Sequence, residues 1–157
     1  MIKVIGIGNV LMGNDGIGIK VVEALDEKLR NIGVDCIKAE TDVDYALDNI
    51  KDGDFLFIID SISEKTAKYG EIMEISIEQV VNNNRSFSVH NMSLISAIRE
   101  LNIKVSGIIL GIKAESIEFN FDLSDQLKSE FNIICSKVYE VVEKNIFEYE
   151  RKEKGNA

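Results

Sequence analysis

Two aspartates and one histidine are the residues of this sequence whose types and positions could do chemistry. Asp15 lies in a glycine-rich segment, Asp60 ends the strongest apolar run, and His90 is the only histidine in the 157 residues. Two carboxylates and an imidazole offer oxygen and nitrogen donors that suit nickel, zinc or iron better than copper(I). The three residues are far apart in the chain, so this metal-binding hypothesis requires a fold that brings them together.

Each of these residues also has an explanation that needs no ligand. Aspartate is a common N-cap, and Asp15 could cap the helix that follows it. Asp60 could cap the next turn through Ser61 or Ser63. A lone histidine such as His90 is more often a packing or capping residue than a ligand. The structural and the functional explanations therefore compete at all three positions.

The glycine-rich segment from Gly6 to Gly18 raises a nucleotide-binding alternative. It follows an expected strand and opens an expected helix, which is where the dinucleotide fingerprint G-x-G-x-x-G occurs. The third glycine of that fingerprint would fall at Leu11, so the residue that normally allows close packing at the pyrophosphate is missing. Glu40 could still bind a ribose, but Asp15 stands where an anion would bind and so favours a cation. A tight turn without any ligand is the third explanation.

Common hydrolase signatures are absent. The sequence has no H-E-x-x-H, G-x-S-x-G or Asp-Thr-Gly motif, so it lacks the usual marks of metalloproteases, serine hydrolases and aspartic proteases. Ser61 or Ser88 could be written as a nucleophilic dyad with His90, but nothing in the sequence positions them.

The composition is that of an acidic globular protein. Acidic residues outnumber basic ones by 27 to 18, which gives a net charge of −9 at pH 7. This charge disfavours nucleic acids and anionic membranes and favours a basic partner or a cation. We interpret the acids between Glu40 and Asp54 as a solvated rim and as helix starts.

We expect a cytoplasmic protein without membrane insertion. No apolar run reaches the ~18 residues of a membrane span, and no signal peptide is recognisable. Cys36 and Cys135 have neither C-x-x-C spacing nor a histidine cluster around them, so we expect two free thiols in a reducing compartment.

Apolar runs alternate with helical periodicities along the chain. The expected strands are 3–8, 34–40, 54–60, 70–76 and 104–112, and the expected helices are 15–32, 92–101 and 123–146. This alternation predicts an α/β fold: a three-layer α/β/α sandwich with a mostly parallel twisted sheet of about five strands. The link between Asp60 and Gly70 is too short for a helical crossover, so strand 70–76 should be antiparallel. We expect residues 1–147 to form a single domain and the polar residues 148–157 to be a disordered tail.

Such a sheet would bring the three candidate residues to one place. Ligands of open α/β sheets bind outside the carboxyl ends of the parallel strands. Asp60 ends the third expected strand, while Asp15 and His90 lie in connections between elements. We therefore expect the three side chains to converge at this edge.

Several motifs together resemble those of the hydrogenase maturation proteases. They are Gly6-x-Gly-Asn-x-Leu-x-x-Asn-Asp-Gly-x-Gly18, the strand that ends at Asp60, Val89-His-Asn-Met-Ser-Leu94 and Ile108-Ile-Leu-Gly-Ile112. The resemblance spans roughly residues 1–146. The His-Asn-Met segment is most similar to the branch that serves formate-hydrogenlyase-type hydrogenases.

The resemblance implies an endopeptidase. Its expected partner is the large-subunit precursor of a nickel-iron hydrogenase, from which it removes a C-terminal extension after nickel insertion. Nickel carried by the substrate would be held by Asp15, Asp60 and His90, and cadmium or zinc could substitute for it in vitro. Either the nickel activates the attacking water, or Asp15 or Asp60 acts as a catalytic general base. The competing hypotheses are a non-proteolytic nucleotide-binding or regulatory module and a maturation scaffold that binds the precursor without cutting it.

The sequence departs from the family pattern at three places. Asn14 replaces the first of the family's paired aspartates. The segment Glu40-Thr-Asp-Val-Asp-Tyr45 stands where the family has a Gly-Thr/Ser stretch, and Lys113-Ala114 stands where it has Gln-Pro. The last two changes bear on substrate contacts and on which large subunit fits.

Overall fold

The apolar runs of the sequence form one five-stranded sheet. The computed structural model describes residues 1–83, 88–114 and 119–155. The strands are β1 (Ile2–Ile7), β2 (Asp35–Glu40), β3 (Phe55–Ile62), β4 (Ile72–Ser76) and β5 (Ser106–Lys113), in the spatial order β2-β1-β3-β5-β4. β1, β2, β3 and β5 run parallel, whereas β4 pairs antiparallel with β5 at one edge. The predicted mostly parallel sheet with one antiparallel strand is confirmed.

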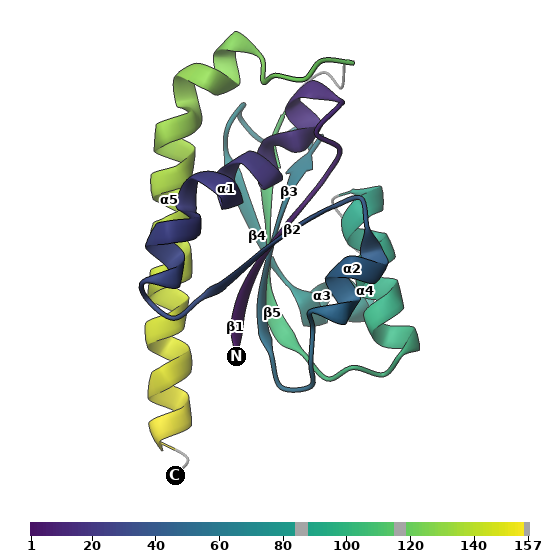
Figure 1. Ribbon diagram of the computed structural model, residues 1–157, viewed down its shortest axis with the longest axis vertical. Helices are drawn as coiled ribbons and strands as arrows, with labels where there is room; N and C mark the ends of the chain where they lie inside the picture. The colour runs from purple at the N-terminus through teal and green to yellow at the C-terminus, as the bar shows by residue number, and fades with distance from the viewer. Residues whose placement is uncertain (84–87, 115–118, 156–157) are drawn as a thin grey trace.

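Helices cover both faces of this sheet (Figure 1). α1 (Ile17–Arg30) and α5 (Asp125–Gly155) lie on one face, and α2 (Val43–Asp48), α3 (Ile77–Asn83) and α4 (Val89–Glu100) lie on the other. Successive residues of a strand point to opposite faces. In β3, Phe57 and Ile59 accordingly join the core under α1 and α5, while Leu56 and Ile58 join the core under the other three helices. The predicted three-layer α/β/α sandwich is therefore confirmed.

Two short helices and one helix start differ from the sequence-based expectation. α2 and α3 have 6 and 7 residues, too few for a helical period to be recognised. α4 begins at Val89 and not at Met92, because the Ser88 hydroxyl accepts the backbone N–H of Asn91 at 3.2 Å and caps the helix. The earlier start places His90 in the first turn of α4.

Helix α1 packs closely on the sheet because glycines stand at the contact. A Cβ on Gly18 would lie 2.3 Å from the carbonyl oxygen of Ile59 in β3. A Cβ on Gly6 in β1 would lie 2.9 Å from the Val22 side chain of α1. Both distances are shorter than van der Waals contact, so a side chain at either position would push the helix away from the sheet. This packing explains both glycines without a bound nucleotide.

The last helix is longer than predicted. α5 continues to Gly155, so residues 148–155 extend the helix and are not a disordered tail, while residues 156–157 lie outside the described part of the chain. Glutamate and lysine in this segment favour helix. Tyr149 also packs against Phe55 of β3, with ring centres 5.4 Å apart. One aromatic contact therefore joins the end of the helix to the sheet.

The acidic segment between β2 and β3 is only partly the solvated rim that was expected. Asp42 accepts the backbone N–H of Tyr45 at 2.9 Å and caps α2, as an acid at a helix start should. Asp54, by contrast, is buried and pairs with the buried Lys3 ammonium at 3.1 Å. The expectation was wrong for Asp54, because the ammonium groups that compensate its charge are those of Lys3 and of the amino terminus at Met1, both remote in sequence.

Both cysteines are free thiols, as predicted. Burial raises the pKa of Cys36 in β2 to about 12 and that of Cys135 in α5 to about 11. Thiols with such pKa values are weak nucleophiles at neutral pH.

In the described part of the chain, none of the helices combines the length and the apolar character needed to cross a bilayer.

Candidate active site

Asp15 lies in a 3-10 turn, Gly13–Gly16, between β1 and α1. The N-cap position of α1 belongs to Gly16, so the capping explanation for Asp15 is wrong. The carboxylate of Asp15 instead accepts two hydrogen bonds at 2.8 Å, one from the backbone N–H of Asn9 and one from the hydroxyl of Ser61 in β3. Asp15 is buried, with 6% of its surface exposed. These bonds place its carboxylate at the carboxyl edge of the sheet.

Asp60 lies near the end of β3, on the face that α4 covers. Its Oδ1 accepts the backbone N–H of Ser61 at 2.8 Å. Its Oδ2 accepts the hydroxyl of Ser88 and, at 3.3 Å, the side-chain N–H of Asn91. The bond to Ser61 matches the local capping that the sequence suggested. The two bonds to the first turn of α4 depend on the fold and show that Asp60 is more than a local cap.

His90 reaches the same edge from α4. Its Nε2 lies 3.2 Å from Oδ2 of Asp15. The His90 side chain is partly exposed, with 29% of its surface accessible, whereas the Asp15 side chain is 8% accessible. His90 is therefore neither a helix cap nor a buried packing residue. It is the part of the site that solvent can reach.

Burial controls the protonation of Asp60. The side chain is fully enclosed, and this burial raises the pKa of Asp60 to about 6. The Ser88 hydroxyl, the His90 imidazole and the Ser61 amide lower the pKa, and the Asp15 carboxylate raises it, but the loss of solvation is the largest effect. A carboxyl group that titrates near pH 6 can accept or release a proton near neutral pH.

The structure brings His90 and Asp15 into direct contact, and Ser61 links Asp15 to Asp60. Within the ranges 1–83, 88–114 and 119–155, however, no three His, Cys, Asp or Glu side chains are grouped so that they could hold a metal ion. The roles of Asp15, Asp60 and His90 as metal ligands, and of the two acids in catalysis, stay predictions.

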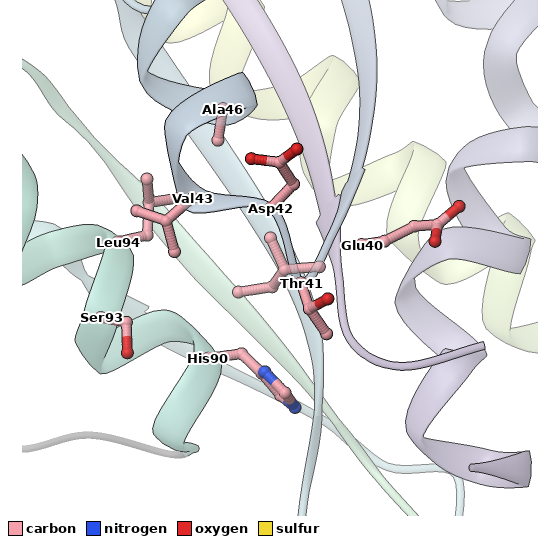
Figure 2. A pocket seen from close by; sticks show the side chains of 9 residues that line it. Glu40, Thr41, Asp42, Val43, Ala46, His90, Ser93 and Leu94 are labelled. Atoms are coloured by element: carbon pink, nitrogen blue, oxygen red, sulfur yellow. The ribbon is translucent and has the colours of Figure 1, made fainter. Parts of the chain in front are cut away.

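A pocket opens beside His90, between α4 and the segment that follows β2. The space between its atoms, open solvent included, is about 330 Å³, and the pocket is lined by Ile7, Glu40, Thr41, Asp42, Val43, Ala46, His90, Ser93 and Leu94. Figure 2 shows the imidazole projecting from α4 towards this segment, while the carboxylate of Glu40 points away from it. The pocket thus has both apolar and polar lining residues, and the candidate imidazole is one of them. The segment that departs from the family pattern after β2 forms part of this pocket.

Sequence reasoning missed the roles of two serines and one asparagine. Ser61 and Ser88 donate their hydroxyls to Asp15 and Asp60, and not to His90 as a nucleophilic dyad would require. Asn91 is completely buried and contacts Asp60. The position of Ser88 just before an apolar-periodic segment was a recognisable capping signal. The contacts of Ser61 and Asn91 depend on tertiary packing and left no local signal.

A second hydrogen-bond cluster fixes the turn that carries Asp15. The side chain of Asn14 donates to the Tyr69 hydroxyl at 2.9 Å and to the Ser124 hydroxyl at 3.2 Å, and it accepts the Ser124 backbone N–H at 2.8 Å. The two hydroxyls lie 2.6 Å apart. Asn14, which replaces an aspartate of the family pattern, therefore joins the turn to the β3–β4 link and to the start of α5.

The sequence and the fold have counterparts in a known class of peptidases. The family model described as hydrogenase maturation protease matches residues 19–141, which is most of the chain. The chain therefore belongs to the hydrogenase maturation protease family and is a peptidase.

Individual relatives agree with this assignment. The chain is 30% identical over 154 residues to a Methanocaldococcus jannaschii protein whose name places it provisionally among the hydrogenase maturation proteases, covering 89% of this chain and 87% of the relative. A hydrogenase maturation protease, HybD, from Thermococcus kodakarensis superposes with a TM-score of 0.71 at 25% identity, covering 90% of this chain and 98% of the other.

The hydrogenase maturating endopeptidase HybD from E. coli has the same fold, with a TM-score of 0.73 at 24% identity over 92% of this chain and 93% of the other. HycI endopeptidases are also among the solved structures with this fold. The assignment to the formate-hydrogenlyase-type branch stays a prediction.

Proposed function

We propose that this peptidase removes a C-terminal extension from the large-subunit precursor of a nickel-iron hydrogenase after nickel has been inserted. In this proposal Asp15, Asp60 and His90 recognise the nickel that the substrate carries. The observation that supports it most directly is the 3.2 Å contact between His90 Nε2 and Asp15 Oδ2 at the carboxyl edge of the sheet. Asp60, held by Ser61 next to that pair, supplies the second carboxylate.

The geometry supports recognition of a metal that arrives from outside. Asp15 and His90 contact each other, and the imidazole is the most exposed of the three groups. A precursor whose nickel has open coordination positions would separate this pair and bind between its members. Binding would then place the scissile peptide beside the site, and such positioning lowers the barrier to attack by water. The pocket beside His90 would receive a side chain of the precursor next to the cleaved bond.

Attack by water needs a proton acceptor. The carboxylates of Asp15 and Asp60 are the candidates for this general base, and the substrate's nickel could share the task by making the water more acidic. Asp60 receives hydrogen bonds from Ser61, Ser88 and Asn91 and has no accessible surface. Asp15 keeps a small exposed fraction next to His90 and is therefore better placed to contact a water molecule.

Processing of a nickel-loaded precursor tests the proposal. The wild-type protein should shorten the large-subunit precursor encoded in the same genome, as measured by intact mass, and should leave the nickel-free precursor intact. The variants Asp15→Asn, Asp60→Asn and His90→Ala should fold and lose this activity. Asp44→Asn, an exposed acid in α2, is the matched control and should retain it.

Two rival functions predict other results. A scaffold would bind the precursor in a pull-down without any change in its mass. A nucleotide-binding module would be stabilised in a thermal-shift assay by NAD or ATP, whereas the proposed site should be stabilised by nickel, cadmium or zinc in a manner that His90→Ala removes. Normal processing by all three site variants would contradict the proposed roles of these residues.

The compartment and the partner follow from the same proposal. A protease that acts on a nickel-loaded precursor works where that precursor is assembled, which we take to be the cytoplasm. The two free thiols and the acidic charge are consistent with this location and with a protein partner rather than a nucleic acid.

A further inference from the structure

A single serine connects the two candidate acids. Ser61 donates its hydroxyl to Oδ1 of Asp15 and its backbone N–H to Oδ1 of Asp60, both at 2.8 Å. Ser61 itself is buried, with 7% of its surface exposed. Bulk water therefore has little access to the position from which the hydroxyl donates.

The position of Ser61 in β3 explains how one residue can reach both acids. Consecutive residues of a strand point to opposite faces of the sheet. Asp60 turns towards α4, where Ser88 and Asn91 hold it. Ser61 turns towards the opposite face and meets Asp15 in the turn before α1. The serine thus joins Asp15, in the turn before α1, to Asp60, which faces the helices on the other side of the sheet.

The bonds of Asp15 show what this hydroxyl determines. Oδ2 faces the backbone N–H of Asn9 and the imidazole of His90, whereas Oδ1 faces the Ser61 hydroxyl. When both carboxylate oxygens accept hydrogen bonds, the plane of the carboxylate is fixed. When only one of them does, the carboxylate can rotate about the Cβ–Cγ bond. We propose that Ser61 is a positioning residue that holds the Asp15 carboxylate in the orientation in which it faces His90. Ser61 thereby sets the geometry with which the site binds the metal of its substrate. This inference rests on the proposed function.

A merely structural role for Ser61 makes a different prediction. A hydroxyl that only satisfies a buried carboxylate would, when removed, lower the stability of the protein and leave the orientation of Asp15 and the affinity for the precursor unchanged. A positioning hydroxyl acts on the site. Removal of groups that orient metal-binding side chains typically weakens binding or activity by about 10- to 100-fold.

The test combines kinetics with crystal structures of three variants. Ser61→Ala removes the hydroxyl and keeps the backbone N–H, while Ser61→Thr keeps the hydroxyl in a residue that suits a strand. Ser106→Ala, a half-buried serine at the start of β5, is the matched control at the other end of the sheet. For each variant we would measure the melting temperature, kcat and KM for the nickel-loaded precursor, and the orientation of Asp15 in metal-free crystals.

We expect Ser61→Ala to remain folded and to raise KM by about 10- to 100-fold, because a misdirected Asp15 holds the substrate's metal less well. A fall in kcat of this variant would add to the effect where Asp15 also serves as the general base. In its crystals the Asp15 carboxylate should be rotated away from His90. Ser61→Thr should restore both properties, and Ser106→Ala should behave like the wild type.

Two results would overturn the inference. One is a Ser61→Ala protein with the wild-type KM and an unmoved Asp15; the other is a failure of a folded Ser61→Thr protein to restore them. If the wild type itself does not cleave the precursor, the proposed function fails, and the crystals still decide whether Ser61 orients Asp15.

Discussion

The imidazole of His90 and the carboxylate of Asp15 lie 3.2 Å apart, although they are separated by 75 positions in the sequence. The histidine comes from the first turn of α4 and the aspartate from the turn before α1, and these two helices cover opposite faces of the sheet. Their contact therefore links the two helical layers across the carboxyl edge of the sheet. Substitutions that shift either helix relative to the sheet should disturb the site even when they are distant from it.

The pH dependence of stability should reveal the burial of Asp60. Its pKa rises from the ordinary value of 3.8 to about 6 in the folded protein, so folding favours the protonated form. Ionisation of Asp60 therefore destabilises the native state as the pH rises through this interval. Asp60→Asn cannot ionise, and we expect the variant to gain about 2 kcal/mol over the wild type between about pH 4 and pH 7.

The local contacts allow this substitution. Asn91 Oδ1 is a buried acceptor without a hydrogen-bond partner in the described part of the structure. An amide at position 60 could donate to it once the Asn91 side chain turns over. Urea unfolding at several pH values measures the effect, and a difference between variant and wild type that stays constant with pH would refute the explanation.

Gly18→Ala should destabilise the protein because α1 has no room for a side chain there. The new Cβ would lie 2.3 Å from the carbonyl oxygen of Ile59. We expect a loss of about 1–3 kcal/mol in the free energy of unfolding, the usual range for overpacking. Gly155→Ala is the control, since no atom lies within 4 Å of the added Cβ. Equal unfolding midpoints for the two variants in urea would mean that the close contact between α1 and β3 is absent.

Tyr149→Ala should show that the end of α5 belongs to the folded domain. The tyrosine ring packs on Phe55 with ring centres 5.4 Å apart, and aromatic pairs contribute about 0.5–1.5 kcal/mol beyond the burial of their surface. We expect a loss of roughly 1 kcal/mol or more on thermal or chemical unfolding. Phe147→Ala, which removes a ring that is 75% exposed, should cost less. A stable Tyr149→Ala protein would indicate that residues 148–155 form a separate tail after all.

The hydroxyls of Tyr69 and Ser124 should act as a unit. They lie 2.6 Å apart, and both accept from the Asn14 side chain. Tyr69→Phe and Ser124→Ala should each cost about 1 kcal/mol of stability, the usual net contribution of a hydrogen bond. Because each change leaves the same partners unsatisfied, the double variant should lose less than the sum. Strict additivity in a double-mutant cycle measured with urea would argue against a connected cluster.

Most of the fold was predictable from the sequence, and the misses have physical reasons. The run that became β3 is almost continuously apolar because the strand is buried on both faces. The short link before β4 correctly indicated an antiparallel strand. α2 and α3 were missed because one or two helical turns carry too few residues to show a period. The extension of α5 was missed because the ring that anchors it, Tyr149, contacts Phe55 of β3, a residue remote in sequence.

The contact between Asp15 and His90 was foreseeable from the sequence, whereas the residues that hold the two acids in place were not. Asp15 lies in a glycine-rich segment, Asp60 follows an apolar run and His90 is the only histidine of the sequence, so the three could be singled out. Ser61 and Asn91 resemble ordinary turn and helix residues, and their contacts arise only when three layers come together. Sequence patterns report on the residues of one element at a time, whereas these contacts join different elements.

The hydrogen bonds that tie Asn14 to Tyr69 and Ser124 also bear on the kinetics of recognition. They hold the turn that carries Asp15 in place without a ligand. Binding of the precursor should therefore cost little conformational entropy in this turn. A preformed site of this kind predicts that the observed rate of complex formation rises linearly with precursor concentration, without a plateau from a slow loop rearrangement.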